Sequence, residues 1–266
     1  MRDMRLVRDL CSALRFFSRL PVPTLPGEVD PHSPPDLPRI AYAIPLAGAV
    51  IAAVAGVVLL IAHAAGLPSL VCAALAISAM VLATGAFHED GLADTADGLG
   101  GGRSREQRLA ILRDSRIGTF GGAALVLSLL LRVAALDGLL DLVGPLRTVC
   151  GMIAAAAGSR AAGILLLQSL PPARTDGAGA SAGVPGPDGL AGCLLTGALV
   201  VAGLLVPTVG VGAAFAGLIA PLLAWFFFHR SAARLIGGQT GDVAGAAQQV
   251  AEIAILLGVL IFAEVH

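Results

Sequence analysis

The stretch that decides the fold is IAYAIPLAGAVIAAVAGVVLLIA, residues 40–62, which contains no charged side chain. A helix needs about 20 consecutive apolar residues to cross the hydrocarbon core of a bilayer, and this stretch is long enough. Comparable apolar runs recur along the chain. The sequence therefore predicts membrane-spanning helices near 40–62, 69–86, 119–136, 148–170, 190–209, 211–228 and 248–264.

The overall composition supports a membrane protein. The chain is 56% hydrophobic and 13% charged, with a mean hydropathy of +0.86. Soluble domains carry about 25% charged residues, so this chain has too few to solvate a water-facing surface. We expect an all-α, polytopic membrane helix bundle of about seven transmembrane helices, forming a single membrane-embedded domain over residues 1–266. The net charge of −1 gives no indication of nucleic-acid binding.

The N-terminal segment has a different pattern. In residues 4–20, apolar side chains recur at three- and four-residue steps, with arginines between them. This pattern predicts an amphipathic helix at the membrane surface. The alternative is an exposed first helix of the bundle. The proline-rich segment 21–38 that follows is predicted to be an irregular loop.

The positions of the arginines predict the orientation in the membrane, since all seventeen basic residues are arginine. Five lie in the N-terminal segment and five in 87–118, whereas the turns expected near 63–68 and 137–147 hold only Arg147. Cytoplasmic loops are enriched in arginine, so the N-terminus and the loop 87–118 are predicted to be cytoplasmic. Strict alternation adds the loops 171–189 and 229–247 to that side and, with seven spans, puts the C-terminus outside. Every acid-rich or glycine-rich loop then faces the cytoplasm.

The segment FHEDGLADTADGLGGG, residues 87–102, is the main candidate for a metal site. Asp90, Asp94 and Asp97 stand at i, i+4 and i+7 and would share one face of a helix, with Glu89 beside them. Like charges at this spacing destabilise a helix unless a cation offsets them. Mg²⁺ takes carboxylate oxygens and keeps waters that substrate phosphates can replace. A solvated acidic loop is the alternative.

A second polar segment, GGQTGDVAGA at 237–246, precedes the last predicted span. Its glycine-rich turn with Thr240 and Asp242 suits a loop that binds phosphate and metal. No GxxxxGK[ST] sequence occurs, so this is not a Walker A motif.

Arg132, Arg160 and Glu252 lie inside predicted spans, where charge is costly. Arg160 and Glu252 are therefore functional candidates, and the structural alternative is an ion pair between them. Arg132 lies nearer the end of a span and is expected to extend its charged group toward the interface.

Other arginines are candidate phosphate contacts. Arg113 and Arg116 lie in ILRDSRIGTFGG, residues 111–122, which follows three consecutive glycines. Their guanidinium groups can fork onto phosphate oxygens, and the alternative is that they only anchor the loop. The loop 171–189 is either a linker or a lid over a cytoplasmic site, with Arg174 as its phosphate contact.

The chain resembles the cobalamin synthase family, also called adenosylcobinamide-GDP ribazoletransferases. The resemblance is carried by RFFSRLPVP at 15–23, HEDGLADTADGLGGG at 88–102, ILRDSRIGTFG at 111–121, SR at 159–160, ARTDGAGA at 173–180, and GGQTGDVAGA at 237–246 with Glu252. Thr175 and Ala178 depart from the family's usual ARPDGLGA pattern.

This resemblance implies a reaction, a cofactor and roles for residues. Adenosylcobinamide-GDP and α-ribazole, or its 5′-phosphate, would give adenosylcobalamin, or its 5′-phosphate, and GMP. Mg²⁺ would be the cofactor, and the enzyme would lie in the cytoplasmic (inner) membrane of a bacterium. The expected metal ligands are Glu89, Asp90, Asp94, Asp97 and Asp242, with Asp97 also the preferred catalytic base. The expected substrate contacts are Arg113, Arg116, Arg160, Arg174, Thr240 and Glu252.

Two alternative functions remain open from the sequence. CDP-alcohol phosphatidyltransferases share acidic helices, but this chain lacks the Ala-Arg step and the long spacing of their signature. A membrane transporter would explain ionisable residues inside spans. Against a transporter, no internal repeat is evident and the polar segments are predicted on one side. The sequence also leaves open whether the protein forms a homo-oligomer.

Overall fold

The computed structural model describes residues 2–25, 35–174 and 183–264. Residues 26–34 of the predicted proline-rich loop lie outside the described residues, as do residues 175–182, which include most of the ARTDGAGA segment and part of the suggested lid. The elements are α1 (Arg2–Phe17), α2 (Leu37–Ile40), the 3-10 helix η1 (Ala41–Ala43), α3 (Ile44–Ala64), α4 (Ser69–Thr84), α5 (Phe87–Gly101), α6 (Arg105–Ile111), α7 (Thr119–Val143), α8 (Pro145–Ser169), α10 (Pro187–Val209), α11 (Val211–Leu235) and α12 (Gly241–Phe262).

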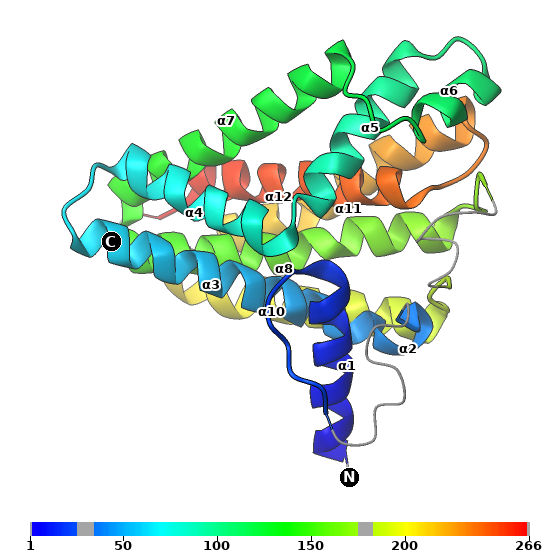
Figure 1. Cartoon of the computed structure of the whole chain (residues 1–266). Helices are drawn as coiled ribbons and strands as arrows, with labels where there is room; N and C mark the ends of the chain where they lie inside the picture. Colours follow the sequence, from blue (N-terminus) through cyan, green and yellow to red (C-terminus); the bar gives the residue numbers. More distant parts are fainter. Residues whose placement is uncertain (1, 26–34, 175–182, 265–266) are drawn as a thin grey trace.

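The long helices confirm the predicted all-α, multi-pass membrane fold. Among the described residues, six helices are long and apolar enough to cross a membrane, and α4 with α5 makes a seventh if the bent pair is one span. The long helices lie side by side, and α1 lies across them (Figure 1). Helix α8 is the most enclosed of the spans, because α3, α10, α11 and α12 all pack against it.

Two predicted loops are shorter than expected. The turn predicted at 137–147 is wrong, because α7 continues to Val143 and α8 begins at Pro145. Gly144 alone joins them, with a φ of 79° that glycine adopts at little cost. The loop predicted at 229–247 is also largely helical, because α11 extends to Leu235 and α12 begins at Gly241.

The polar segments lie at one end of the bundle (Figure 1). Helices α5, α8 and α11 run toward this end, and α3, α7, α10 and α12 begin there. The opposite end carries the short connections 65–68, Gly144 and Gly210. The polar segments therefore lie on the same side of the bundle, as predicted. The assignment of this side to the cytoplasm stays a prediction.

A buried carboxylate fixes α1 on the bundle. Asp9 is 2% exposed, forms an ion pair with Arg39 over 3.0 Å and accepts a hydrogen bond from the Tyr42 hydroxyl over 2.8 Å. These partners lie on α2 and η1. The predicted N-terminal amphipathic helix is therefore present, and its inner face is held by charge as well as by the buried Leu14 and Phe17.

The connection between α4 and α5 is a bend of 88°. Gly85 and Ala86 both adopt positive φ, 65° and 60°, which ends α4 and redirects the chain. The Arg19 amide donates a hydrogen bond to the Ala83 carbonyl over 2.7 Å and so satisfies the end of α4. Because of this bend, α5 packs against α12 and α7. The first half of the predicted loop 87–118 is thus a packed helix, and the loop prediction is wrong there.

Candidate functional site

A cavity of about 140 Å³ lies at the polar end, between α1, α3, α5, α8 and α12. Part of its lining is apolar and comes from these helices. The polar side chains of the lining are His88, Asp90, Arg160, Arg174, Gln239, Thr240, Asp242 and Gln248. The cavity is smaller than the roughly 300–1,000 Å³ that usually enclose a small ligand, so it can receive only part of a large one.

Three carboxylates from two distant parts of the sequence gather here: Asp90 and Asp242 line the cavity, and Asp94 lies near them outside its lining. Asp90 and Asp94 lie on α5 and Asp242 lies in the first turn of α12, and the charges of Asp90 and Asp242 both act on Asp94. Gly91 allows this approach, because a Cβ there would stand 2.9 Å from the Asp242 carbonyl oxygen. In the described part of the chain, no three His, Cys, Asp or Glu side chains already stand as a formed metal site.

Thr240 places Asp242 at the start of α12. The Thr240 hydroxyl caps the helix by accepting a hydrogen bond from the Val243 amide, and it also reaches the Asp242 carboxylate, both over 3.3 Å. A negative side chain is favoured at a helix N-terminus, where free amides point outward. Thr240 and Asp242 therefore contact each other at this helix start, and their predicted binding of phosphate and metal stays a prediction.

Arg174 reaches the same carboxylate from the segment after α8. Its Nη2 lies 3.0 Å from Asp242 Oδ2. The backbone of this segment is tied to the loop before α12: the Ala173 amide donates to the Gln239 carbonyl, and the Gln239 amide donates to the Pro171 carbonyl, each over 2.8 Å. This pairing brings Arg174 into the cavity.

Arg105 stabilises this backbone pairing, a role that was not predicted from the sequence. Its Nε donates to the Ile236 carbonyl over 2.8 Å, and its Nη2 donates to the Ala173 carbonyl over 3.1 Å. In the sequence, Arg105 only adds to the positive charge of 87–118. No pattern could have revealed its role, because its partners are backbone carbonyls far along the chain.

Asp97 has a different environment from the other predicted metal ligands. Its carboxylate accepts hydrogen bonds from the Gly118 amide over 2.6 Å and from the Gly121 amide over 2.9 Å, at the start of α7. A Cβ at either glycine would collide with this carboxylate. Asp97 therefore caps α7 in this structure, and this capping competes with its predicted catalytic and metal-binding roles.

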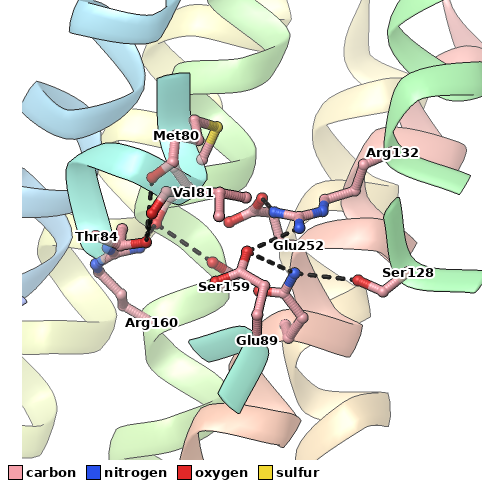
Figure 2. A network of polar contacts seen from close by, with 11 residues as sticks. Met80, Val81, Thr84, Glu89, Ser128, Arg132, Ser159, Arg160 and Glu252 are labelled. Atoms are coloured by element: carbon pink, nitrogen blue, oxygen red, sulfur yellow. Dashed lines mark hydrogen bonds and ion pairs between the residues drawn. The ribbon is translucent and has the colours of Figure 1, made fainter. Parts of the chain in front are cut away.

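Glu89, also predicted as a metal ligand, belongs to a buried charge network. Arg132 Nη2 donates to Glu89 over 2.8 Å, and Arg132 Nη1 lies 3.5 Å from Glu252. Figure 2 shows the Arg132 guanidinium between the two carboxylates. The expectation that Arg132 extends to the interface is wrong: it is 1% exposed, because both of its partners lie inside the bundle. Glu252 pairs with Arg132 and not with Arg160, which corrects the alternative expected for Glu252.

Arg160 lines the cavity although it is only 3% exposed. Its Nη1 donates to the Ala156 carbonyl over 2.6 Å, and its guanidinium lies over the Phe17 ring, 5.8 Å from the centroid. Its Nε has no hydrogen-bond partner among the described residues. Arg160 thus retains a donor, and its predicted contact with a phosphate stays a prediction.

Arg113 and Arg116 lie on the exposed connection between α6 and α7, not in the cavity lining. Arg116 donates hydrogen bonds from its Nε and Nη2 to Asp114. These bonds lower the pKa of Asp114 to about 2. The structure therefore does not bring these two arginines to Asp90 and Asp242, and their predicted substrate contacts remain predictions.

The fold and the site define a multi-pass helical membrane protein with an acid-lined cavity at one end. A family model described as cobalamin-5-phosphate synthase matches residues 9–260. The chain belongs to this family, which confirms the resemblance found in the sequence and sets aside the CDP-alcohol phosphatidyltransferase and transporter alternatives.

Individual relatives agree with this family. A protein of Azorhizobium caulinodans named adenosylcobinamide-GDP ribazoletransferase is 59% identical over the full length of both chains. A protein of Xanthobacter autotrophicus with the same name is 61% identical over 258 residues, 97% of each chain. One from Sinorhizobium is 44% identical over 252 residues, 93% of this chain and 94% of its own. No solved structure matches the chain.

Proposed function

We propose that this protein is an adenosylcobinamide-GDP ribazoletransferase. It transfers the adenosylcobinamide-phosphate group to α-ribazole or its 5′-phosphate and releases GMP, which yields adenosylcobalamin or its 5′-phosphate. Its family and its relatives' names support the reaction. The structural observation that carries the proposal is that Asp90, Asp242 and Arg174 line one cavity, with Asp94 close enough for both carboxylate charges to act on it.

The proposed cofactor is Mg²⁺, held by Asp90, Asp94 and Asp242. Oxygen ligands of this kind suit a hard divalent cation, and three mutually repelling carboxylates are stabilised by one. Bound Mg²⁺ would neutralise the diphosphate and polarise the phosphorus that is attacked. Asp97 is left out of this proposed set, because the amides of Gly118 and Gly121 bind both of its oxygens. Glu89 is left out because it pairs with Arg132 inside the bundle and does not line the cavity.

The arginines of the cavity would bind the diphosphate. Arg174 can exchange its single contact with Asp242 for phosphate oxygens, and Arg160 has its Nε free for the same purpose. Arginine–phosphate contacts are charge-assisted and directional, so they also orient the reacting phosphorus. The amides at the start of α12 add favourable charge at the same place.

The transfer forms one P–O bond and breaks another. The ribose 3′-hydroxyl of ribazole attacks the phosphorus attached to the corrin side chain, and the bond to GMP breaks. The hydroxyl proton passes to a carboxylate, which we assign to Asp90 because it lines the cavity and is exposed to it. The protein mainly has to position the reactants and offset charge, as in other phosphoryl transfers.

We further propose that the protein lies in the cytoplasmic (inner) membrane with this cavity facing the cytoplasm. The exposed arginines gather at the end of the bundle that carries the cavity, as expected for a cytoplasmic face. Nucleotide substrates would reach it from that side.

The decisive experiment measures GMP release by the full chain purified in nanodiscs. Adenosylcobinamide-GDP, α-ribazole 5′-phosphate and Mg²⁺ are supplied, with and without EDTA. The proposal expects GMP release that EDTA abolishes and inhibition by added GMP but not CMP. Absence of GMP release from folded protein would refute the reaction, and release that survives EDTA would refute the metal requirement.

A further inference from the structure

The cavity has an aromatic wall that the phosphate chemistry does not use. Phe16 of α1 and Phe87 of α5 both line it, with ring centroids 5.7 Å apart. Phe17 also lines the cavity, with its ring centroid 4.8 Å from that of Phe16 and 6.1 Å from that of Phe87. Phe17 packs α1 against the bundle and lies under the Arg160 guanidinium. Diphosphate, metal and ribose are all polar, so none of them accounts for Phe16 and Phe87 at the cavity.

His88 adds one polar atom to this wall. Its ring stacks parallel to Phe17 at 6.1 Å with an interplanar angle of 7°. The side chain is 4% exposed and lines the cavity, yet its Nε2 has no hydrogen-bond partner among the described residues. A buried polar atom without a partner is unfavourable, so a ligand that supplies one would be stabilised here.

We infer that this wall, formed by Phe16, Phe87 and His88, binds the planar base of the α-ribazole acceptor. The inference rests on the proposed function and adds a binding place for one of its substrates. A benzimidazole base is a flat, apolar bicycle whose one free ring nitrogen accepts a hydrogen bond. It therefore matches an aromatic surface with one donor, which the Nε2–H tautomer of His88 provides.

Guanine fits this wall less well. Its edge carries a carbonyl, a ring N–H and an amino group, and each needs a partner when buried. The wall itself offers only His88 for them, and the Gln248 amide is the other polar group of the lining close to His88. The arrangement of groups within α-ribazole also favours it, because the ribose that carries the reacting hydroxyl is attached directly to the base. This hydroxyl must lie near the acids, and His88 and Asp90 line the same cavity. A base on His88 thus leaves the attached ribose beside Asp90.

The first test replaces the stacking surface and separates the two substrates. We expect Phe87→Leu, which keeps an apolar side chain but removes the flat ring, to raise the KM for α-ribazole about tenfold. The KM for adenosylcobinamide-GDP should change by less than about twofold, because the diphosphate contacts are untouched. Phe227→Leu on α11, 63% exposed and outside the described cavity lining, is the matched control and should change neither.

The second test examines the proposed hydrogen bond from His88 Nε2 to the free ring nitrogen of the base. We expect the native protein to bind a benzimidazole riboside more tightly than the matching indole riboside, which lacks the accepting nitrogen, by about tenfold or more. His88→Leu should remove this preference by weakening benzimidazole binding alone. Titration of each nucleoside without the second substrate supplies the measurement, so the result does not depend on turnover.

The outcomes separate this inference from the proposed function. A native protein that releases no GMP refutes the proposed function. A native protein that turns over, with Phe87→Leu raising the KM for adenosylcobinamide-GDP instead, assigns the wall to the other substrate and overturns the inference. An unchanged preference for benzimidazole in His88→Leu overturns the role of His88.

Discussion

Arg132 of α7 donates a hydrogen bond to Glu89 of α5 over 2.8 Å, and both side chains are buried inside the bundle. Glu252 of α12 lies 3.5 Å from the same guanidinium. The three charges therefore join three helices directly after the bend that begins α5. Isolated charges are costly at such a position, and mutual pairing is what makes them tolerable.

Replacing Arg132, the positive charge of this network, should destabilise the protein more than replacing an exposed arginine. Arg132→Met leaves the Glu89 and Glu252 carboxylates buried without a counter-charge, so we expect a loss of about 3–5 kcal/mol in the free energy of unfolding. Unfolding in mixed detergent micelles measures this. Adding Glu89→Gln to Arg132→Met should recover part of the loss.

Arg103→Met, on the exposed connection after α5, is the control for this change. It should alter the unfolding free energy by less than about 0.5 kcal/mol. Equal destabilisation by the two substitutions would mean that the Arg132 network contributes nothing specific.

The sequence predicted the membrane helices well because their signal is local. A run such as 40–62 is apolar along its whole length, and length alone separates it from a soluble helix. The acid spacing likewise predicted that Asp90 and Asp94 share a face. The helix start at Gly241 was not predicted, because the sequence placed Thr240 and Asp242 in a loop before a span at 248–264.

Other features could not be predicted, because they depend on contacts between distant segments. Nothing near Arg132 in the sequence indicates that the bend at Gly85 brings Glu89 to it. Asp97 belongs to the same acidic pattern as Asp94, yet the amides of Gly118 and Gly121 bind its carboxylate. The sequence shows the charge of each acid, and only the fold determines which partner it meets.

The close contact of α5 with α12 gives a second prediction. Gly91→Ala places a methyl group 2.9 Å from the Asp242 carbonyl oxygen, which is too close for a van der Waals contact. The helices must separate, and we expect GMP release to fall about 10- to 100-fold, because small displacements of reacting groups are costly. Gly203→Ala on α10, where a Cβ meets nothing within 4 Å, should keep full activity.

A third prediction separates capping from catalysis at Asp97. The Gly118 and Gly121 amides bind different oxygens of Asp97, so Asp97→Asn turns a donor NH2 group toward one of them and loses that hydrogen bond. We expect the amides of 118–122 to exchange hydrogen faster than in the native protein, and exchange near Gly144 to stay the same. Native exchange at 118–122 together with lost turnover would instead support the catalytic role predicted from the sequence.

The exposed pair of Arg116 and Asp114 gives a prediction about pH. The pKa of Asp114 is lowered from 3.8 to about 2 by hydrogen bonds from Arg116. A lowered folded-state pKa means that the pairing stabilises the loop above pH 3.8 and is lost as the pH falls through about 2. In Arg116→Gln, the pKa of Asp114 should return toward 3.8, as measured by NMR titration of labelled aspartate in nanodiscs. An unchanged midpoint would contradict this pairing in solution.

The last prediction concerns Asp94, whose charge lies among those of Asp90, Asp242 and Asp97. Asp94→Asn removes one negative charge and one metal-binding oxygen while keeping the shape of the side chain. In the proposed mechanism, we expect turnover to fall about 100-fold or more, with normal membrane insertion. Asp188→Asn, in the exposed first turn of α10, removes the same charge elsewhere and should have no effect.

The two variants also report on repulsion within the acid cluster. Because like charges surround Asp94 and destabilise the protein without a cation, Asp94→Asn should unfold at a higher temperature than the native protein when Mg²⁺ is absent. Added Mg²⁺ should stabilise the native protein and Asp188→Asn, but stabilise Asp94→Asn less, since a ligand that binds the folded state raises its stability. Equal stabilisation of all three proteins by Mg²⁺, with Asp94→Asn fully active, would place the metal elsewhere.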